Sequence, residues 1–189
     1  MIKDLILKNR SYRRFYQDVT IDQKTLRELI DLARLSASGS NLQPLKYIIS
    51  YKPQKNALIF QHLAWAGYLK DWPGPEEGEK PAAYIIILGD TKIKKDFGCD
   101  HGIAAQSILL GAVENGFGGC MFGSIKREKL RQTLKIPSRY EILLVLAIGK
   151  PKETVVIEST GETKDIKYWR DSEGIHHVPK RSLEEIIIG

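Results

Sequence analysis

Two short segments near the ends of the chain carry the side chains whose types and spacing best suit chemistry. They are Arg10-Ser11-Tyr12-Arg13-Arg14-Phe15 and Pro179-Lys180-Arg181-Ser182. A guanidinium fork, a hydroxyl and a backbone amide can together bind one phosphate, because the donors of arginine match the geometry of phosphate oxygens. Taken alone, each segment is more typical of a solvated surface. The pair becomes a candidate anion site if the fold brings its two halves together.

The standard nucleotide-binding signatures are missing from the sequence. No Gly-x-Gly-x-x-Gly follows a strand-like run. Gly118 to Gly123 has the glycine spacing of a phosphate loop, but Ser124-Ile125 follows it instead of Lys-Ser/Thr. These patterns argue against a Rossmann dehydrogenase and against a P-loop NTPase.

The potential metal ligands are Cys99-Asp100-His101, Cys120 and His176-His177, and their spacing matches no zinc motif. We expect core or solvent-facing roles for them. Neither cysteine has the neighbours of a catalytic nucleophile. Two cysteines without a secretory signal predict a reducing, cytoplasmic compartment, in which both are small core residues rather than a disulfide.

The composition is that of one soluble domain over residues 1–189, with 42% hydrophobic and 28% charged residues. The net charge of +6 would suit a nucleic-acid binder if the cations were clustered, but Lys and Arg are interleaved with Asp and Glu. No apolar run reaches the roughly 18 residues that span a bilayer. We therefore expect no nucleic-acid or membrane partner, and a mildly basic field that attracts phosphate-bearing small molecules.

Apolar periodicity and Gly/Pro breakers predict alternating helices and strands, which indicates an α+β fold. The expected helices are 2–9, one from Asp22, one after the first strand to about Leu69, 102–115 and 127–134. The expected strands are 47–51, 82–88, 118–123 and 142–149. Residues 36–44, 71–78 and 152–164 are expected to be loops.

Several motifs, taken in order, resemble those of the nitroreductase family. Asn9 to Phe15 is similar to its N-terminal Arg-Arg-Ser-x-Arg-x-Phe/Tyr signature, and Ser38 to Pro44 to its Pro-Ser-x-x-Asn-x-Gln-Pro-Trp loop. Asp100 to Ser107 resembles the central helix, Gly118 to Gly123 the glycine-rich strand, and Leu146 to Pro151 the Gly-x-Pro turn. Each match is weak alone, but the ordered set covers almost the whole chain.

The resemblance implies an FMN site. The cofactor-binding residues that it suggests are Arg10, Ser11, Arg13, Ser38, Asn41, Gln43, Met121, Phe122, Gly123, Lys180 and Arg181. Arg10, Lys180 and Arg181 would neutralise the FMN phosphate, and Ser11 would add a hydroxyl bond. Arg13 would place a cation near N1 and O2 of the isoalloxazine, where negative charge develops on reduction.

The resemblance also implies a central, mostly antiparallel sheet flanked by helices, and an intertwined homodimer. Ser38 would reach the flavin from the partner subunit, with Asn41 and Gln43 nearby, while residues 121–123 pass the ring face and its N5 edge. The chain would take hydride from NAD(P)H and pass electrons to a nitroaromatic, a quinone or a similar small acceptor by a ping-pong mechanism. FMN would carry the chemistry, so no catalytic side chain is expected.

Departures from the family pattern leave alternatives open. Asn9, Ala37 and Leu45 stand where the family has arginine, proline and an aromatic residue. Trp65, Tyr68 and Trp72 form either an aromatic lid or ordinary packing. Gln106 contacts the flavin or is satisfied inside the helix bundle. A non-catalytic flavin-binding protein and a same-fold enzyme with other chemistry, such as reductive dehalogenation, are the alternative functions.

Overall fold

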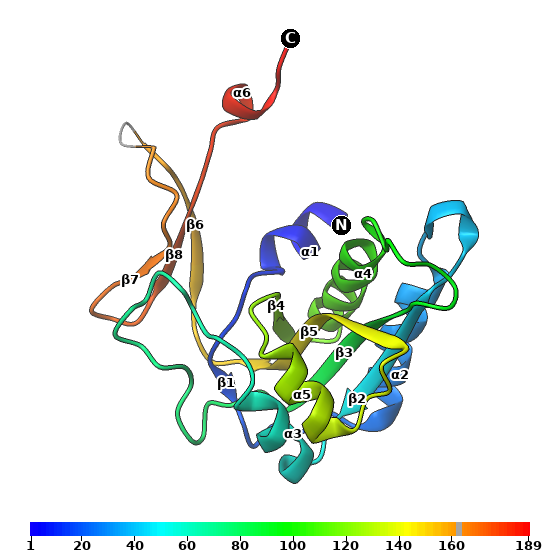
Figure 1. Cartoon of the computed structure of the whole chain (residues 1–189). Helices are drawn as coiled ribbons and strands as arrows, with labels where there is room; N and C mark the ends of the chain where they lie inside the picture. Colours follow the sequence, from blue (N-terminus) through cyan, green and yellow to red (C-terminus); the bar gives the residue numbers. More distant parts are fainter. Residues whose placement is uncertain (162–163) are drawn as a thin grey trace.

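Two long apolar runs form the centre of the protein, because their side chains can be buried on both faces of a sheet. The computed structural model describes residues 1–161 and 164–189 (Figure 1). In it, β3 (Ala83–Asp90) is buried along its whole length and pairs antiparallel with β5 (Tyr140–Pro151). The predicted strands 82–88 and 142–149 are therefore confirmed as the core of the sheet.

The remaining strands of the main sheet extend this pair on both sides. β2 (Leu45–Ser50) lies antiparallel beside β3, while β4 (Gly118–Phe122) pairs antiparallel with β5. The two-residue β1 (Phe15–Tyr16) pairs with the end of β5. Every pairing within this five-stranded sheet is antiparallel, which confirms the expected sheet type and the α+β class.

Helices cover both faces of the main sheet. α2 (Gln23–Leu35) and α4 (Asp100–Glu114) pack on one face against Ile85 and Ile87 of β3, and α1 (Ile2–Lys8) lies beside α4. α3 (Pro53–Phe60) and α5 (Arg127–Leu134) pack on the other face against Tyr84, Ile86 and Leu88. Successive strand side chains point to opposite faces, so one apolar strand contributes to two cores.

The third predicted helix is shorter than expected, because α3 ends at Phe60 and not near Leu69. The chain after Phe60 instead forms backbone hydrogen bonds with residues that are distant in sequence. Leu63 forms a bridge with Ile125, and the Ala64 N–H donates to the Ser124 carbonyl at 3.1 Å. Local periodicity carries no information about these distant partners.

The C-terminal region forms a second, three-stranded sheet beside the first. β6 (Val155–Ser159) pairs parallel with β8 (His176–Lys180), and β7 (Trp169–Arg170) pairs antiparallel with β8. The prediction of a loop over 152–164 was therefore wrong for β6, and its residues 162–163 lie outside the described part of the chain. The short α6 (Leu183–Ile186) follows β8 and projects away from the rest of the molecule (Figure 1).

Within the described residues, no helix combines the length and the apolar character that crossing a bilayer requires. Cys120 is buried and Cys99 is exposed, and both carry free thiols. The expectation of two core cysteines holds for Cys120 alone.

Candidate functional site

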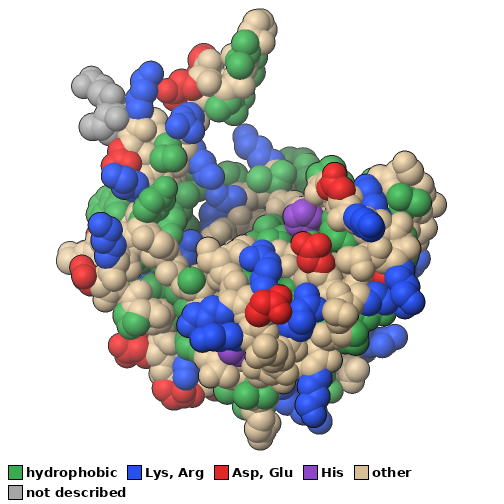
Figure 2. All heavy atoms as spheres, viewed as in Figure 1, with side chains coloured by type: hydrophobic (Ala, Val, Ile, Leu, Met, Phe, Trp, Pro, Cys, Tyr) green, Lys and Arg blue, Asp and Glu red, His purple; other side chains and the backbone are tan. Residues whose placement is uncertain are grey.

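A cavity of about 270 Å³ lies where the N-terminal segment meets β8. It is lined by Asn9, Arg10, Ser11, Arg13, Tyr168, His176, Val178 and Lys180. Three of these side chains are cations and none is a carboxylate, so the cavity attracts anions. We call β8, α6 and the residues after them, 176–189, the C-terminal arm. Figure 2 shows Lys and Arg side chains along this arm, leading into the hollow between the arm and α1. We call this space the cationic cavity.

The cationic cavity unites four residues that sequence patterns selected from opposite ends of the chain. Arg10, Ser11 and Arg13 enter from the segment between α1 and β1, and Lys180 enters from the end of β8. Arg181 follows β8 directly, is exposed, and does not line the cavity.

The glycine-rich strand β4 holds the N-terminal segment in place. Ser11 forms a parallel bridge with Gly119, whose carbonyl accepts the Tyr12 N–H at 3.0 Å. A Cβ at Gly118 would lie 2.5 Å from the Tyr12 ring, and one at Gly119 would lie 2.4 Å from the Ala147 carbonyl oxygen. These two glycines are therefore explained by close packing of the backbone, not by ligand contact.

Alternation along β8 selects the side chains that face the cationic cavity. His176, Val178 and Lys180 all line it, since residues i, i+2 and i+4 of a strand share one face. His177, on the opposite face, stacks on the Trp169 ring at 4.0 Å. Lys180 was predicted from the sequence as a residue of this site and His176 was not, although the period-2 alternation of a strand places both on one face.

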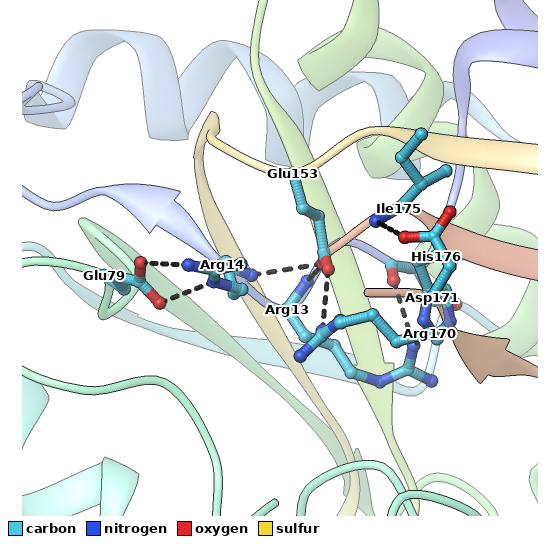
Figure 3. Close-up of polar contacts among 9 residues, drawn as sticks. Arg13, Arg14, Glu79, Glu153, Arg170, Asp171, Ile175 and His176 are labelled. Carbon is cyan, nitrogen blue, oxygen red and sulfur yellow. Dashed lines mark hydrogen bonds and ion pairs between the residues drawn. The ribbon is translucent and has the colours of Figure 1, made fainter. Parts of the chain in front are cut away.

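Glu153 is the buried residue that joins the two walls of the cationic cavity (Figure 3). Its side chain is fully buried. Oε1 accepts the backbone N–H groups of Arg13 and Arg14, and Oε2 accepts from Arg170 Nη2 of β7 at 2.9 Å. The next residue along, Thr154, accepts the His176 N–H at 2.9 Å. Residues 153–154 thus bind the N-terminal segment on one side and the second sheet on the other.

A second ion-pair cluster holds the outer side of the N-terminal segment. Arg14 donates from Nε and Nη2 to both Glu79 oxygens at 2.6 Å, a bidentate arrangement, and Lys152 Nζ lies 3.0 Å from Glu79 Oε1. The Glu79 carbonyl also accepts the Phe15 N–H at 3.0 Å. The hydrogen bonds from Arg14 are the main cause that lowers the pKa of Glu79 from 4.5 to about 2, outweighing its partial burial.

We expect Glu79→Gln to lower the free energy of unfolding by about 1–3 kcal/mol near neutral pH, because hydrogen bonds to charged groups are lost. A depressed pKa in the folded state contributes stability above pH 4.5 that disappears as the pH falls toward 2. The two proteins should therefore converge in stability between about pH 5 and pH 2 in urea titrations. Glu76→Gln at an exposed position is the control, and an equal pH slope in wild type and E79Q would contradict the assignment.

Arg13 is a nearly buried cation without a carboxylate on its guanidinium. The residue is 9% exposed, and Nη1 donates to the Ser11 carbonyl at 3.2 Å and contacts His176 Nε2 at 3.1 Å. Nε and Nη2 donate to no acceptor among residues 1–161 and 164–189. Neither of these two atoms is among the buried side-chain atoms that lack a partner, so both are open to solvent or to a ligand in the cavity.

Two polar atoms of residues that line the cationic cavity are buried and have no hydrogen-bond partner within the described residues, namely Arg10 Nε and His176 Nδ1. Arg10 Nη2 donates to the Ile6 carbonyl at the end of α1, at 2.7 Å. Burial, followed by the charge of Arg13, lowers the pKa of His176 to about 4, so its ring is neutral near pH 7. A cavity with unsatisfied donors and no carboxylate fits a ligand rich in acceptor oxygens.

The predicted loop residues Ser38, Asn41 and Gln43 lie elsewhere in this chain. Ser38 and Gln43 line a separate cavity of about 200 Å³, and Ser38 Oγ donates to buried Asp100 at 2.7 Å. Asn41 is exposed and its Oδ1 accepts from Gln43 Nε2 at 3.2 Å. In Figure 1 the chain between α2 and β2 lies far from β8, on the opposite side of the view. One chain therefore does not bring the two predicted sets of residues together.

The three predicted residues at the end of β4 have different environments. Met121 is 37% exposed, and a Cβ at Gly123 would meet nothing within 4 Å. Phe122 is buried in the core, with its ring 4.6 Å from Trp65. Its side chain is therefore part of the core and does not face a ligand.

The aromatic excursion after α3 is mainly packing. Trp65 contacts Phe122 and also Trp72, whose ring lies 6.4 Å away. Tyr68 differs, because it is 50% exposed and its ring lies 4.9 Å from Tyr168, which lines the cationic cavity. Of the three residues of the predicted lid, Tyr68 is the exposed one that lies beside the cationic cavity, and the lid stays a prediction.

Gln106 is exposed on α4, so the interpretation of a polar residue satisfied inside the helix bundle was wrong. Its Oε1 accepts from Asn9 Nδ2 at 3.4 Å, next to the cationic cavity. No group of three or more His, Cys, Asp or Glu side chains is arranged to hold a metal in the part of the chain that the structure describes.

The fold and the cationic cavity agree with a known family of proteins. The sequence model of the nitroreductase family matches residues 6–150, which is most of the chain, and the protein belongs to this family. The nitroreductase family is one of oxidoreductases, so this membership indicates an oxidoreductase.

Curated relatives are consistent with this assignment. A candidate NAD(P)H nitroreductase of Bacillus subtilis, YodC, is 23% identical over 177 residues, covering 78% of this chain and 88% of the relative. A candidate NADH dehydrogenase/NAD(P)H nitroreductase of Archaeoglobus fulgidus is 26% identical over 157 residues, covering 79% and 84%.

Solved structures show the same fold. A nitroreductase family protein of Streptococcus pneumoniae aligns with a TM-score of 0.73 and 17% identity over 100% of both chains. An FMN-dependent nitroreductase of Clostridium difficile aligns with a TM-score of 0.68 and 22% identity over 100% of this chain and 98% of the other.

Proposed function

We propose that this protein is an FMN-dependent oxidoreductase that takes hydride from NAD(P)H and reduces a small acceptor, such as a nitroaromatic or a quinone. The observation that carries the proposal is the convergence of Arg10, Ser11, Arg13 and Lys180 on one cavity without a carboxylate. Membership of the nitroreductase family and the NAD(P)H-dependent names of its relatives support it.

The cationic cavity fits the phosphate end of FMN. The phosphate carries about two negative charges near neutral pH, which Arg10 and Lys180 would offset. Ser11 supplies a hydroxyl, and the unpartnered Arg10 Nε is a further donor for oxygen atoms. Arg181 would act only after a movement of the exposed tail, because it does not line the cavity in this structure.

When bound, FMN supplies the hydride chemistry, accepting a pair of electrons from the nicotinamide and passing them to the acceptor. The chain orients the two substrates, which use one exposed face of the flavin in turn and so give ping-pong kinetics. Arg13 would hold a cation near the atoms on which negative charge develops, and a cation fixed in advance stabilises such charge without reorganisation. Residues 121–123 would lie near the flavin ring, as the family resemblance implies.

A homodimer would explain why the predicted cofactor-binding residues of one chain lie in two separate places, at the cationic cavity and at the loop that carries Ser38. We propose that Ser38, Asn41 and Gln43 complete the cationic cavity of the partner subunit. The C-terminal arm supports this arrangement, because Leu183, Ile186, Ile187 and Ile188 are 58–98% exposed and α6 contains no buried residue. Apolar side chains on a projecting arm are typical of a surface that another subunit covers.

Cofactor titration tests the phosphate site directly. The apoprotein should bind FMN more tightly than riboflavin, as measured by quenching of flavin fluorescence. Lys180→Ala should raise the dissociation constant of FMN by about 10- to 100-fold through loss of one charged contact, and leave that of riboflavin nearly unchanged. Lys129→Ala, at an exposed position of α5, is the matched control. Equal affinity for the two flavins would contradict the proposed site.

Reduction of the bound flavin separates an enzyme from a flavin-binding protein. Under argon, NADH or NADPH should bleach the yellow colour of the loaded protein, and a quinone or nitroaromatic should restore it. Protein that stays yellow with both nicotinamides would contradict the oxidoreductase proposal and favour a binding function.

A further inference from the structure

His176 is a buried histidine whose position no sequence motif of the site explains. It is 1% exposed, lines the cationic cavity from β8, and its Nε2 lies 3.1 Å from Arg13 Nη1. We infer that His176 is a positioning residue that accepts a hydrogen bond from Arg13 and thereby fixes the guanidinium at the cofactor. This inference rests on the proposed function, since it concerns how Arg13 meets the flavin.

Hydrogen-bond chemistry fixes the form of the ring. A guanidinium can only donate, so His176 Nε2 must be the acceptor and its lone pair must be free. The neutral ring then carries its proton on Nδ1, the atom that has no partner among the described residues. A doubly protonated ring would place two donors against each other, and the contact with Arg13 would be lost.

Three contacts around Arg13 together define one orientation. The Tyr168 ring lies 4.6 Å from Arg13 Cζ on one face of the guanidinium, and the His176 and Tyr168 rings are 5.2 Å apart. The Ser11 carbonyl accepts a hydrogen bond from Arg13 Nη1 within the segment between α1 and β1. A long arginine side chain has many rotamers, and ordering it before the ligand arrives lowers the entropy that binding must overcome.

The arrangement uses Nη1 for the protein and leaves the rest of the fork for the ligand. Both side-chain hydrogen bonds of Arg13 involve Nη1. Nη2 and Nε donate to no acceptor among the described residues. A carboxylate in place of His176 would neutralise the cation and compete with the ligand. A neutral imidazole holds the guanidinium and keeps its charge available.

The tautomer can be measured without turnover. In protein labelled with ¹⁵N at histidine, with His176 assigned by substitution, the ring of His176 should show a protonated Nδ1 and an unprotonated Nε2 near pH 7. The spectrum should be the same in the apoprotein, because the contact with Arg13 belongs to the chain. A ring protonated on Nε2, or on both nitrogens, would overturn the inference.

Two substitutions test the positioning role. His176→Phe keeps a ring and removes the acceptor, and His176→Gln places an amide oxygen near the position of Nε2. We expect H176F to make the midpoint potential of bound FMN more negative and to slow its reduction by NAD(P)H about tenfold, the effect of one hydrogen bond. H176Q should recover most of the loss in both measurements.

His177→Gln is the matched control, since its side chain lies on the other face of β8 between Glu158 and Asp171. It should leave the flavin potential at the wild-type value. If wild type binds and reduces FMN but H176F has the same potential and rate, the inference fails and the proposed function stands. If wild type binds no FMN, the proposed function fails, while the tautomer still reports on the contact with Arg13.

Discussion

Replacing Glu153 with alanine is expected to lower the free energy of unfolding by about 3–5 kcal/mol, the range found when one partner of a buried charged network is removed. The carboxylate accepts two backbone N–H groups and the Arg170 guanidinium, and its own side chain is fully buried. Alanine leaves all three donors without their acceptor. Denaturant unfolding followed by circular dichroism measures the loss.

The same substitution should separate the two walls of the cationic cavity. Glu153 holds residues 13–14 against β7, so its loss should weaken FMN binding even under conditions in which the main sheet remains folded. Glu173→Ala at an exposed loop position is the control and should change stability by less than about 0.5 kcal/mol. A stable E153A that binds FMN with wild-type affinity would show that other contacts join the walls.

Replacing Arg13 with methionine is expected to have the opposite combination of effects. Loss of a preorganised donor at a site of developing charge typically costs about 10²- to 10³-fold in rate, so reduction of bound FMN by NAD(P)H should slow by about that factor. Stopped-flow absorbance under argon measures it. FMN binding should weaken less, because Arg10 and Lys180 still face the phosphate site.

The stability of R13M should stay close to that of wild type. The Arg13 guanidinium is 3.1–3.2 Å from two neutral partners and has no carboxylate, so its burial is itself unfavourable and methionine fills similar space. Arg27→Met on the exposed side of α2 is the control for a lost surface charge. An unchanged rate of flavin reduction in R13M would remove Arg13 from the mechanism.

Local sequence predicted those elements whose burial is set by their own residues. The helix 127–134 is reproduced as α5, and the apolar runs at 82–88 and 142–149 became β3 and β5. The Asp22 side chain accepts the Thr25 N–H at 2.7 Å, as a residue at the start of a helix should. Such signals act within one or two turns of chain.

Features that depend on distant partners were missed. β6 is a strand only because β8 pairs with it, and α3 stops only because residues 63–64 bond to residues 124–125. Glu153 falls in the predicted loop 152–164 and has no distinguishing local pattern. The backbone N–H groups that donate to its carboxylate belong to residues 13–14, which are distant in sequence. Within the candidate site, the cations were predictable from composition, whereas His176 required the face of β8 to be known.

One wall of the cationic cavity comes from residues that lie after the part of the chain matched by the family model. The match to the nitroreductase family ends at Lys150, yet Tyr168, His176 and Lys180 all come after it. The matched part of the chain therefore supplies the main sheet and one wall of the cavity, and residues after the match supply the other wall. Synthesis adds β8 after every strand of the main sheet, so the residues that complete the cavity are among the last to leave the ribosome.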